Sequence, residues 1–291
     1  MHKPSLLYIV LAGVLWGSAV IFSKILGSFG FTPLQMTVMR NAVSALALFL
    51  YILIKNSRQF KAPIKEIVLF VLSGLCILFT GTFYYTAMKM TTPSIAVVLM
   101  YIAPILVMAV SVLFMGERFN MLKGLAVAFA FIGCGLVTGI IGGIKFNLLG
   151  IGIGALSGIC YAAYNICAKI EMKRGNDAVT ASFYCFLGAA IIGILICNPV
   201  SLGNALSEAT AKAVPFIIAQ GLFTGAIPYF LYTLASKRLP AGIASATGSI
   251  EPMSATIISI VFFNEVLEIQ GLIGILMILT AVLLLSKSED K

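Results

Sequence analysis

The chain has 291 residues, of which 60% are hydrophobic and only 10% are charged, and its mean hydropathy is +1.08. Soluble domains carry about 25% charged residues, so this composition excludes a soluble globular protein. It indicates an all-α integral membrane protein in a lipid bilayer. The net charge of +9 would also suit a nucleic-acid partner, so the positions of the basic residues have to be considered.

Ten apolar segments of about 20 residues, the length that crosses the hydrocarbon core of a bilayer, follow one another along the chain. The predicted helices span residues 5–26, 33–54, 66–88, 94–115, 122–141, 149–170, 177–198, 214–234, 242–263 and 269–285. The apolar run from Ser5 has no clear small-x-small cleavage site and is long for a signal peptide. We therefore expect it to be the first transmembrane helix.

Lysine and arginine lie mostly in one set of the connecting loops. With the N-terminus inside, fourteen of them fall on the cytoplasmic side, and three, Lys89, Lys145 and Lys212, fall on the opposite side. Because short basic loops remain in the cytoplasm, we predict a multi-pass protein of the plasma (inner) membrane with both termini cytoplasmic. Membrane topology accounts for the basic residues, so we expect no nucleic-acid partner.

The two halves of the chain carry the same landmarks in the same order. Pairs at an offset of 145 or 148 residues are Gly13 and Gly158, Trp16 and Tyr161, Lys24 and Lys169, Pro104 and Pro252, and Glu117 and Glu265. A unit of five helices is odd, so the second copy must be inverted, as in secondary transporters with a site near the membrane midplane. We predict two inverted repeats, residues 1–143 and 148–287.

Polar side chains form stripes on most of the predicted helices but hardly on 122–141 and 269–285. Thr37, Arg40 and Ser44, for example, share one face of helix 33–54. We expect the striped helices to line a cavity and the other two to lie outside it. Glycines in helix 122–141 suit packing within the subunit or a homodimer contact, so a monomer and a homodimer both remain open.

Several motifs in this chain resemble those of the drug/metabolite transporter superfamily, EamA type. They are Trp16–Gly17, Arg40 in a helix that begins at Pro33, Pro104 followed by Gly116–Glu117, and Glu251–Pro252 followed by Glu265, with Asn264 in place of the usual glycine. The resemblance covers nearly the whole chain as two EamA-like units. It implies a basket-like fold of ten helices and the export of amino acids and related metabolites, often coupled to an ion gradient.

Two charged residues lie within predicted transmembrane helices. Arg40 keeps its proton and needs an acceptor, which is either a substrate carboxylate or phosphate or a structural partner. Glu251 would cost about 3 kcal/mol as a charge at bilayer depth, and burial favours its neutral form. It is either a site that couples transport to protons or another ion, or a structural carboxyl. An amino acid would match both charges.

The other candidate residues come from the polar stripes and the aromatic positions, whose rings accept cations or flat side chains. Candidates for substrate binding or coupling are Trp16, Asn41, Tyr85, Tyr101, Tyr161, Asn165, Tyr229 and Thr247. Interhelical packing is the alternative role for Trp16. Lys24 and Lys169 are candidate gating residues, with snorkelling to lipid headgroups as the alternative. Three prolines interrupt backbone bonding within predicted helices and are candidate hinges: Pro104, Pro228 and Pro252.

The sequence predicts a secondary active transporter that exports small polar metabolites, amino acids or related compounds, by alternating access at a midplane site. An importer or a drug or toxin exporter of the same fold is the alternative, and a channel or a membrane enzyme is a more distant one. The six cysteines include no CxxC pair, and the single histidine is His2. We therefore expect no metal, cofactor or catalytic site.

Overall fold

The computed structural model describes residues 3–91, 96, 99–116, 119–137, 147–208, 211–248, 250–263 and 269–288. Within these ranges the regular structure is helical, with no strand. Six helices there are long and apolar enough to cross a membrane: Pro4–Ser28, Pro33–Lys55, Ile64–Met90, Leu148–Lys173, Ala178–Cys197 and Ala211–Ser236. They correspond to the first three predicted helices of each half. Shorter apolar helices cover Ala103–Phe114, Met121–Gly133 and Ile269–Ala281.

The first half of the chain contributes helices whose ends follow from local sequence signals. They are α1 (Lys3–Gly17), α2 (Ala19–Ser28), α3 (Pro33–Lys55), η1 (Ser57–Phe60), α4 (Ile64–Met90), α6 (Ala103–Phe114) and α7 (Met121–Val137). At the start of α3, the side chains of Thr32 and Gln35 form a capping box. The amide groups of Thr32 and Gln35, which have no partner within the helix, are satisfied in this way.

The second half begins in the same way, with a polar side chain at the start of each of its first two helices. Its elements are α8 (Leu148–Lys173), α9 (Ala178–Cys197), α10 (Pro199–Glu208), η2 (Ala211–Ala213), α11 (Val214–Gln220), the π-helical η3 (Gly221–Ala226), α12 (Ile227–Ser236), α13 (Ala241–Thr247), α14 (Ile250–Phe263) and α15 (Ile269–Ser288). Asn147 caps α8 by accepting from the amide of Gly150, and Asp177 caps α9. Short polar side chains of this kind are favoured at helix starts.

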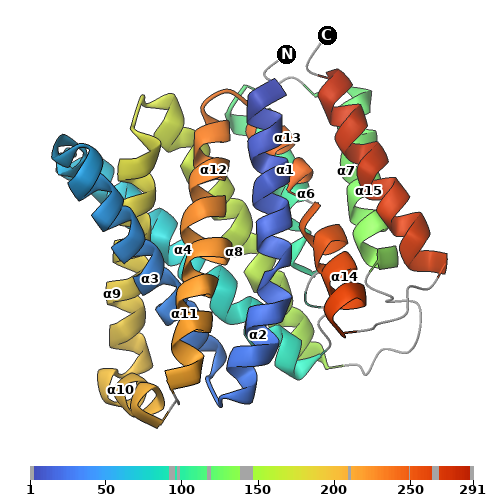
Figure 1. Cartoon of the computed structure of the whole chain (residues 1–291). Helices are drawn as coiled ribbons and strands as arrows, with labels where there is room; N and C mark the ends of the chain where they lie inside the picture. The colour runs from blue at the N-terminus through green and yellow to red at the C-terminus, as the bar shows by residue number, and fades with distance from the viewer. Residues whose placement is uncertain are drawn as a thin grey trace.

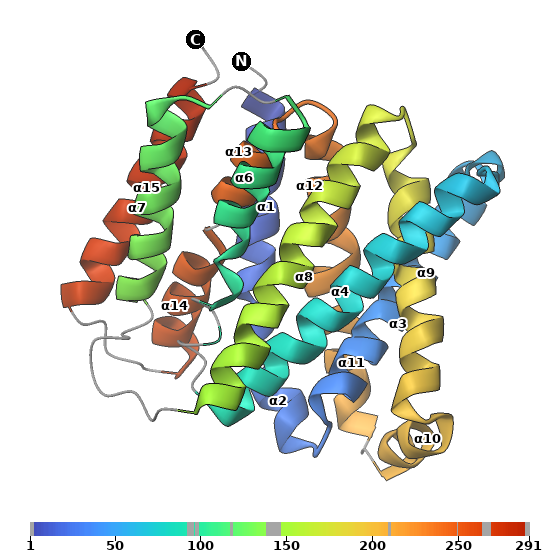
Figure 2. The same cartoon turned by 180° about the vertical axis from the view of Figure 1, so that it is seen from behind.

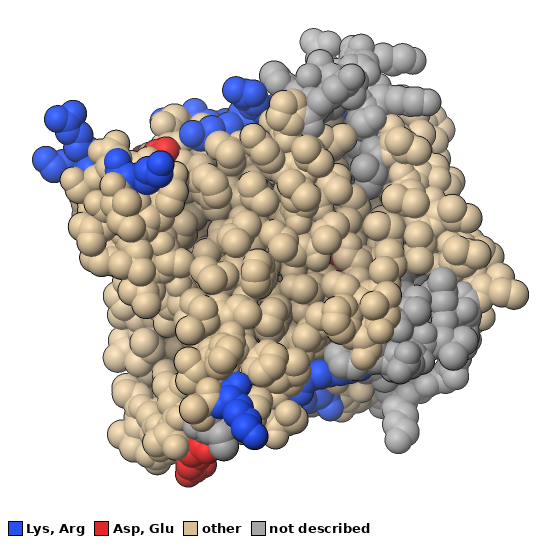
Figure 3. All heavy atoms as spheres, in the orientation of Figure 1, with Lys and Arg blue, Asp and Glu red and all other residues tan. Residues whose placement is uncertain are grey.

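The helices stand side by side, with α9 and α10 at one edge and α7 and α15 at the other (Figures 1 and 2). The two ends of the chain lie on the same side of the molecule, where α3, α8 and α12 also end (Figure 1). On the face shown in Figure 3, lysine and arginine atoms gather at the two ends, and the surface between them is almost entirely uncharged. This distribution is expected for a protein that crosses a bilayer.

Helices α7 and α15 pack against each other away from the centre of the molecule (Figures 1 and 2). A Cβ atom at Gly133 would lie 2.9 Å from the carbonyl oxygen of Gly274, so this glycine allows close packing within the subunit. Glu117 and Glu265, which were paired in the predicted repeat, lie outside the described residues.

Two predicted helices, 94–115 and 242–263, are not continuous as expected. A turn at Tyr101–Ile102 precedes α6, and a turn at Gly248 separates α13 from α14. Pro104 and Pro252 therefore lie in the first turn of a new helix instead of inside a long one. Proline is tolerated there because the first turn has no intrahelical partner for its missing N–H.

Pro228 lies at the start of α12, directly after the π-helical η3. The wider turns of η3 take up the backbone disturbance that a proline causes in a regular α-helix. A polar stripe was expected along one continuous helix over residues 242–263. The break at Gly248 corrects this expectation, because Thr247 ends α13 and Glu251 lies in the first turn of the next helix, α14.

The contact between α4 and α9 gives a test of the packing. A Cβ atom at Gly74 would lie 2.1 Å from the carbonyl oxygen of Cys185. We expect Gly74→Ala to push the helices apart and destabilise the protein by about 1–3 kcal/mol, measured as a lower midpoint of thermal unfolding in detergent. The control is Gly152→Ala in α8, where a Cβ meets nothing within 4 Å and alanine should stabilise the helix by up to about 1 kcal/mol. Equal midpoints for the two variants would contradict the packing.

Candidate functional site

A central pocket with about 420 Å³ of space between its wall atoms lies among α1, α3, α4, α8, η3, α12 and α14. Its walls are formed by Trp16, Ala19, Arg40, Thr80, Gly81, Tyr84, Tyr85, Met100, Tyr161, Thr224, Tyr229 and Glu251. In this conformation it is narrow, and only a few water molecules fit. A larger molecule needs a movement of the walls to enter.

Arg40 enters this pocket from α3, and its side chain is only 6% exposed. Its Nε and Nη2 atoms donate to Oδ1 of Asn41 over 3.4 and 3.3 Å. The guanidinium carbon lies 5.8 Å from the ring centre of Tyr229, within the range of a cation–π interaction. Among the described residues no carboxylate lies within 4 Å of it. A side chain with five donors thus faces the pocket without a carboxylate in ion-pair contact among the described residues.

Glycines on the neighbouring helices make the room for Arg40. A Cβ atom at Gly81 in α4 would lie 3.2 Å from Nη2 of Arg40, and one at Gly225 in η3 would lie 2.1 Å from Oγ of Ser44. The Ser44 hydroxyl lies 2.7 Å from the carbonyl oxygen of Arg40 and 2.8 Å from that of Gly221. Helix α3 is therefore held closely against α4 and η3, and the guanidinium occupies the space that larger side chains would take.

Glu251 lies in the first turn of α14 and is partly buried. The Tyr101 hydroxyl lies 2.9 Å from Oε2 of Glu251 and 2.9 Å from the carbonyl oxygen of Gly248. Tyr101 belongs to the helix break of the first half and Gly248 to that of the second. One side chain therefore joins the two breaks and holds Glu251.

The pair Trp16–Gly17 explains how α1 reaches the pocket. A Cβ atom at Gly17 would lie 2.6 Å from Cβ of Ser254, so glycine allows α1 to pack directly on α14. Trp16 is 5% exposed, and its ring centre lies 5.0 Å from that of Tyr229 and 6.2 Å from that of Tyr161. The tryptophan both packs against neighbouring aromatic rings and forms part of the pocket wall.

The structure brings most of the predicted binding residues together. Those in the pocket wall are Trp16, Arg40, Tyr85, Tyr161, Tyr229 and Glu251. Asn41 and Tyr101 adjoin the wall, because they bond to Arg40 and Glu251. Asn165 and Thr247 are buried but are not among the residues that line the pocket. Arg40 and Glu251 face one pocket without forming an ion pair within 4 Å.

The two lysines proposed as gates lie in different surroundings. Lys169 is 7% exposed, and its ammonium group donates to the carbonyl oxygen of Leu239 and, over 3.1 Å, to that of Ser236. It therefore holds the C-terminal end of α12, where a cation is favourable. Lys24 is exposed on α2.

Several residues of the site were not predicted. Thr80, Gly81, Met100 and Thr224 line the pocket, and a glycine inside an apolar helix such as Gly81 is a signal of close packing. Gln220 is fully buried, and among the described residues neither polar atom of its amide has a hydrogen-bond partner within 3.5 Å. An amide within an apolar transmembrane segment is itself a signal of function.

The Tyr101 hydroxyl gives a test of the link between the helix breaks. Tyr101→Phe removes its bonds to Gly248 and Glu251 without changing the ring, so we expect a loss of about 1–2 kcal/mol in stability, seen as a lower thermal midpoint. Tyr51→Phe is the control, because Tyr51 is 47% exposed on α3. A Tyr101→Phe protein as stable as the control would show that the hydroxyl does not hold the two breaks together.

Comparison with known proteins agrees with this architecture. The EamA-like transporter family matches residues 3–139 and again 148–287. An uncharacterized transporter of Archaeoglobus fulgidus is 28% identical over 95% of this chain and 94% of its own length. The uncharacterized transporter YwfM of Bacillus subtilis is 22% identical over 98% of this chain and 94% of its own. One protein crystal structure shares the fold, with a TM-score of 0.80 over 100% of both chains at 16% identity. The chain belongs to the EamA-like transporter family and is a multi-pass membrane protein.

Proposed function

We propose that this protein is a secondary active transporter that exports a small zwitterionic metabolite, an amino acid or a close relative, through the central pocket. One observation carries this proposal. The guanidinium of Arg40 and the carboxyl of Glu251 belong to the wall of the same pocket, and among the described residues neither forms an ion pair within 4 Å. An amino acid supplies the missing partner of each, a carboxylate for Arg40 and an ammonium for Glu251.

The bonds of Tyr101 support a coupling of this transport to protons. Its hydroxyl has one hydrogen but lies 2.9 Å from two acceptors, the Gly248 carbonyl and the Glu251 carboxyl. Both bonds form at once when Glu251 is protonated and donates to the Tyr101 oxygen, while Tyr101 donates to Gly248. A substrate ammonium then replaces the proton at Glu251. Substrate and proton exclude each other at one carboxyl, which is the requirement for their exchange across the membrane.

The arrangement of the helices supports two inverted repeats, residues 1–143 and 148–287, as the moving halves. Helix α1 starts on the side where both termini lie, whereas α8, the first helix of the second half, ends there (Figures 1 and 2). Interrupted helices at corresponding positions of two halves are the usual place of a transporter's binding site. The breaks at Tyr101 and Gly248 fit this description, and both adjoin the pocket through Glu251.

The basic residues support an orientation with both termini in the cytoplasm. Helices α3 and α8 end with Lys55 and Lys173 on the side of the termini (Figure 1). Positively charged segments stay on the cytoplasmic side of a plasma membrane. In this orientation the proposed export moves substrate from the side of the termini to the opposite side.

Binding can be tested with the protein's own fluorescence. Trp16 is the only tryptophan of the chain and lines the pocket, so its emission reports on ligands bound there. We expect an amino acid identified in a screen to change this emission, and Arg40→Gln to weaken binding roughly tenfold or more, because a charge-assisted bond contributes about 1.5–3 kcal/mol.

The matched control for this test is Arg174→Gln, because Arg174 is half exposed and pairs with Glu66 outside the pocket. It should bind and exchange substrate in proteoliposomes like the wild type. A folded Arg40→Gln protein that binds and exchanges the same amino acid with wild-type constants would contradict the proposed role of the guanidinium.

Proton coupling predicts a specific dependence on pH. Efflux from proteoliposomes should be faster when the side that receives the substrate is acidic, because protonation of Glu251 there displaces the substrate. Glu251→Gln should remove this acceleration, since the amide cannot take up a proton. The measurement is efflux of labelled substrate with and without a pH gradient. An acceleration that persists in Glu251→Gln would show that another group carries the coupling.

A further inference from the structure

A second buried carboxyl group, Glu171 in the last turn of α8, is not explained by the central pocket. Its side chain is 2% exposed and accepts a hydrogen bond from the hydroxyl of Ser73 in α4. No lysine or arginine among the described residues lies within 4 Å of it. A buried carboxylate without a cation is costly, so this residue calls for an explanation beyond packing.

Ser73 lies between a backbone carbonyl and Glu171, the same pattern of partners that Tyr101 has with Gly248 and Glu251. The Ser73 hydroxyl has one hydrogen and two neighbouring acceptors, the Leu69 carbonyl at 3.2 Å and the Glu171 carboxyl. Both bonds form together when Glu171 carries a proton and donates to Ser73, while Ser73 donates to Leu69. The surroundings therefore suit the neutral acid and offer no ion pair to the carboxylate.

Glu171 lines a narrow space that reaches the wall of the central pocket. This space has a volume of about 190 Å³. It is lined by Ile77, Tyr164, Glu171, Ala181, Ser182, Cys185, Phe186, Tyr229 and Thr233. In this conformation it does not admit a water molecule. Tyr229 also belongs to the wall of the central pocket. A small widening beside Tyr229 would thus connect Glu171 with the pocket that contains Glu251.

A second observation marks this space as a site for a proton or water. The hydroxyl of Ser182 in α9 lines it, is 4% exposed and has no hydrogen-bond partner within the described part of the chain. Leaving a buried hydroxyl unsatisfied costs about 1–3 kcal/mol, and a water molecule admitted to the space would satisfy it. Serine can then accept one proton and donate another.

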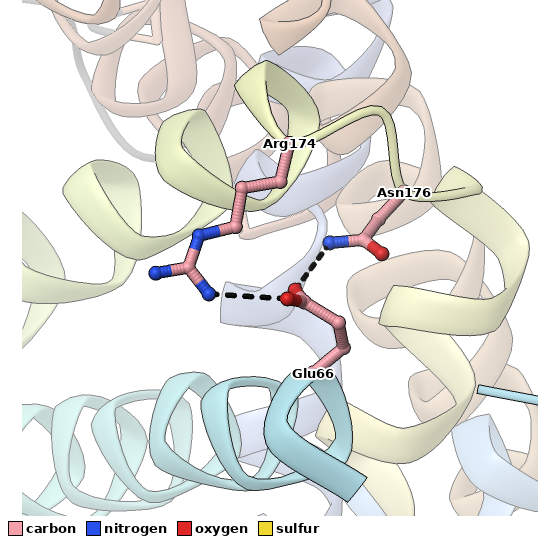
Figure 4. Close-up of polar contacts among 3 residues, drawn as sticks. All are labelled: Glu66, Arg174 and Asn176. Atoms are coloured by element: carbon pink, nitrogen blue, oxygen red, sulfur yellow. Dashed lines mark hydrogen bonds and ion pairs between the residues drawn. The ribbon is translucent and has the colours of Figure 1, made fainter. Parts of the chain in front are cut away.

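The titratable groups that surround Glu171 in the described part of the chain do not provide a counter-ion for its carboxylate. Titratable groups around it are Cys167 of α8, Glu66 and Cys76 of α4, Cys185 of α9, and the phenols of Tyr164 and Tyr229. Arg174, three residues further on, is held by Glu66 over 3.1 Å, and Glu66 also accepts from Asn176 over 2.6 Å (Figure 4). The nearest arginine in sequence is therefore already paired.

We propose that Glu171 is a second proton-binding site, through which the proton taken up at Glu251 leaves on the side of the α8–α9 turn. When the space beside Tyr229 widens and admits water, Glu251 gives its proton to that water, and Glu171 takes one up. Glu171 then releases a proton to the solvent at the end of α8 and returns to the carboxylate. This inference rests on the proposed function, because it supplies the route for the coupled proton.

Infrared difference spectroscopy tests proton binding independently of transport. Acid-minus-alkaline spectra of the purified protein in lipid should contain the carbonyl band of a protonated carboxylic acid that disappears in Glu171→Gln. A different component should disappear in Glu251→Gln. Glu208→Gln is the control, since Glu208 is exposed at the end of α10 and should leave both bands unchanged. Spectra of Glu171→Gln identical to the wild type would overturn the proposal.

Transport then separates the two proposals. Glu171→Gln should keep substrate exchange, which needs no net proton movement, but lose the acceleration of efflux by a pH gradient. Ser182→Ala should reduce this acceleration. Full acceleration of efflux in Glu171→Gln would refute the proton route through Glu171 but would not contradict the proposed transport function. Wild-type protein that exchanges no zwitterion would refute the proposed substrate, while the spectra still test Glu171. If Glu171→Gln does not fold, Glu171→Asp should keep the carbonyl band of the protonated acid, and the pH midpoint at which this band appears should shift. An unchanged pH midpoint would contradict the proposed proton site at Glu171.

Discussion

The Tyr101 hydroxyl joins the two places where the transmembrane backbone is interrupted. It lies 2.9 Å from the Gly248 carbonyl and from the Glu251 carboxyl, so one phenol from the first half contacts both a backbone carbonyl, which also accepts from the amide of Glu251, and a partly buried acid of the second. Backbone groups at membrane depth must find partners within the protein. The start of α14, and with it the position of Glu251 in the pocket wall, depends on this contact.

Hydroxyl groups hold the partly buried Glu251, through Tyr101, and the buried Glu171, through Ser73; no cation among the described residues forms an ion pair with either. A salt bridge would stabilise the carboxylate and keep it charged. A hydroxyl can donate a hydrogen bond to the carboxylate, or it can accept one from the protonated acid while it donates to a backbone carbonyl. Arg40 shows the complementary situation, a permanent charge with an amide and an aromatic ring as neighbours. These arrangements leave room for a proton or a substrate to complete the bonding.

Much of the fold could be predicted from local signals, but the helix breaks could not. Apolar length alone located spans such as 33–54 and 149–170, which correspond to α3 and α8. The segment 242–263 has the same apolar length and yet divides at Gly248. Hydropathy does not distinguish a continuous helix from a broken one, because a side chain that bonds to the break, Tyr101, lies in the other half of the chain.

The sequence by itself determined the membrane class, the EamA resemblance and the two unusual charges, Arg40 and Glu251, because these depend on composition and local pattern. Only the tertiary structure decided which side chains meet. It showed that Lys169 holds the end of α12, and that Glu171, which attracts no notice in the sequence, is buried against Ser73. Periodicity tells which face of a helix a residue occupies, but the neighbour across that face is set by the packing of distant segments.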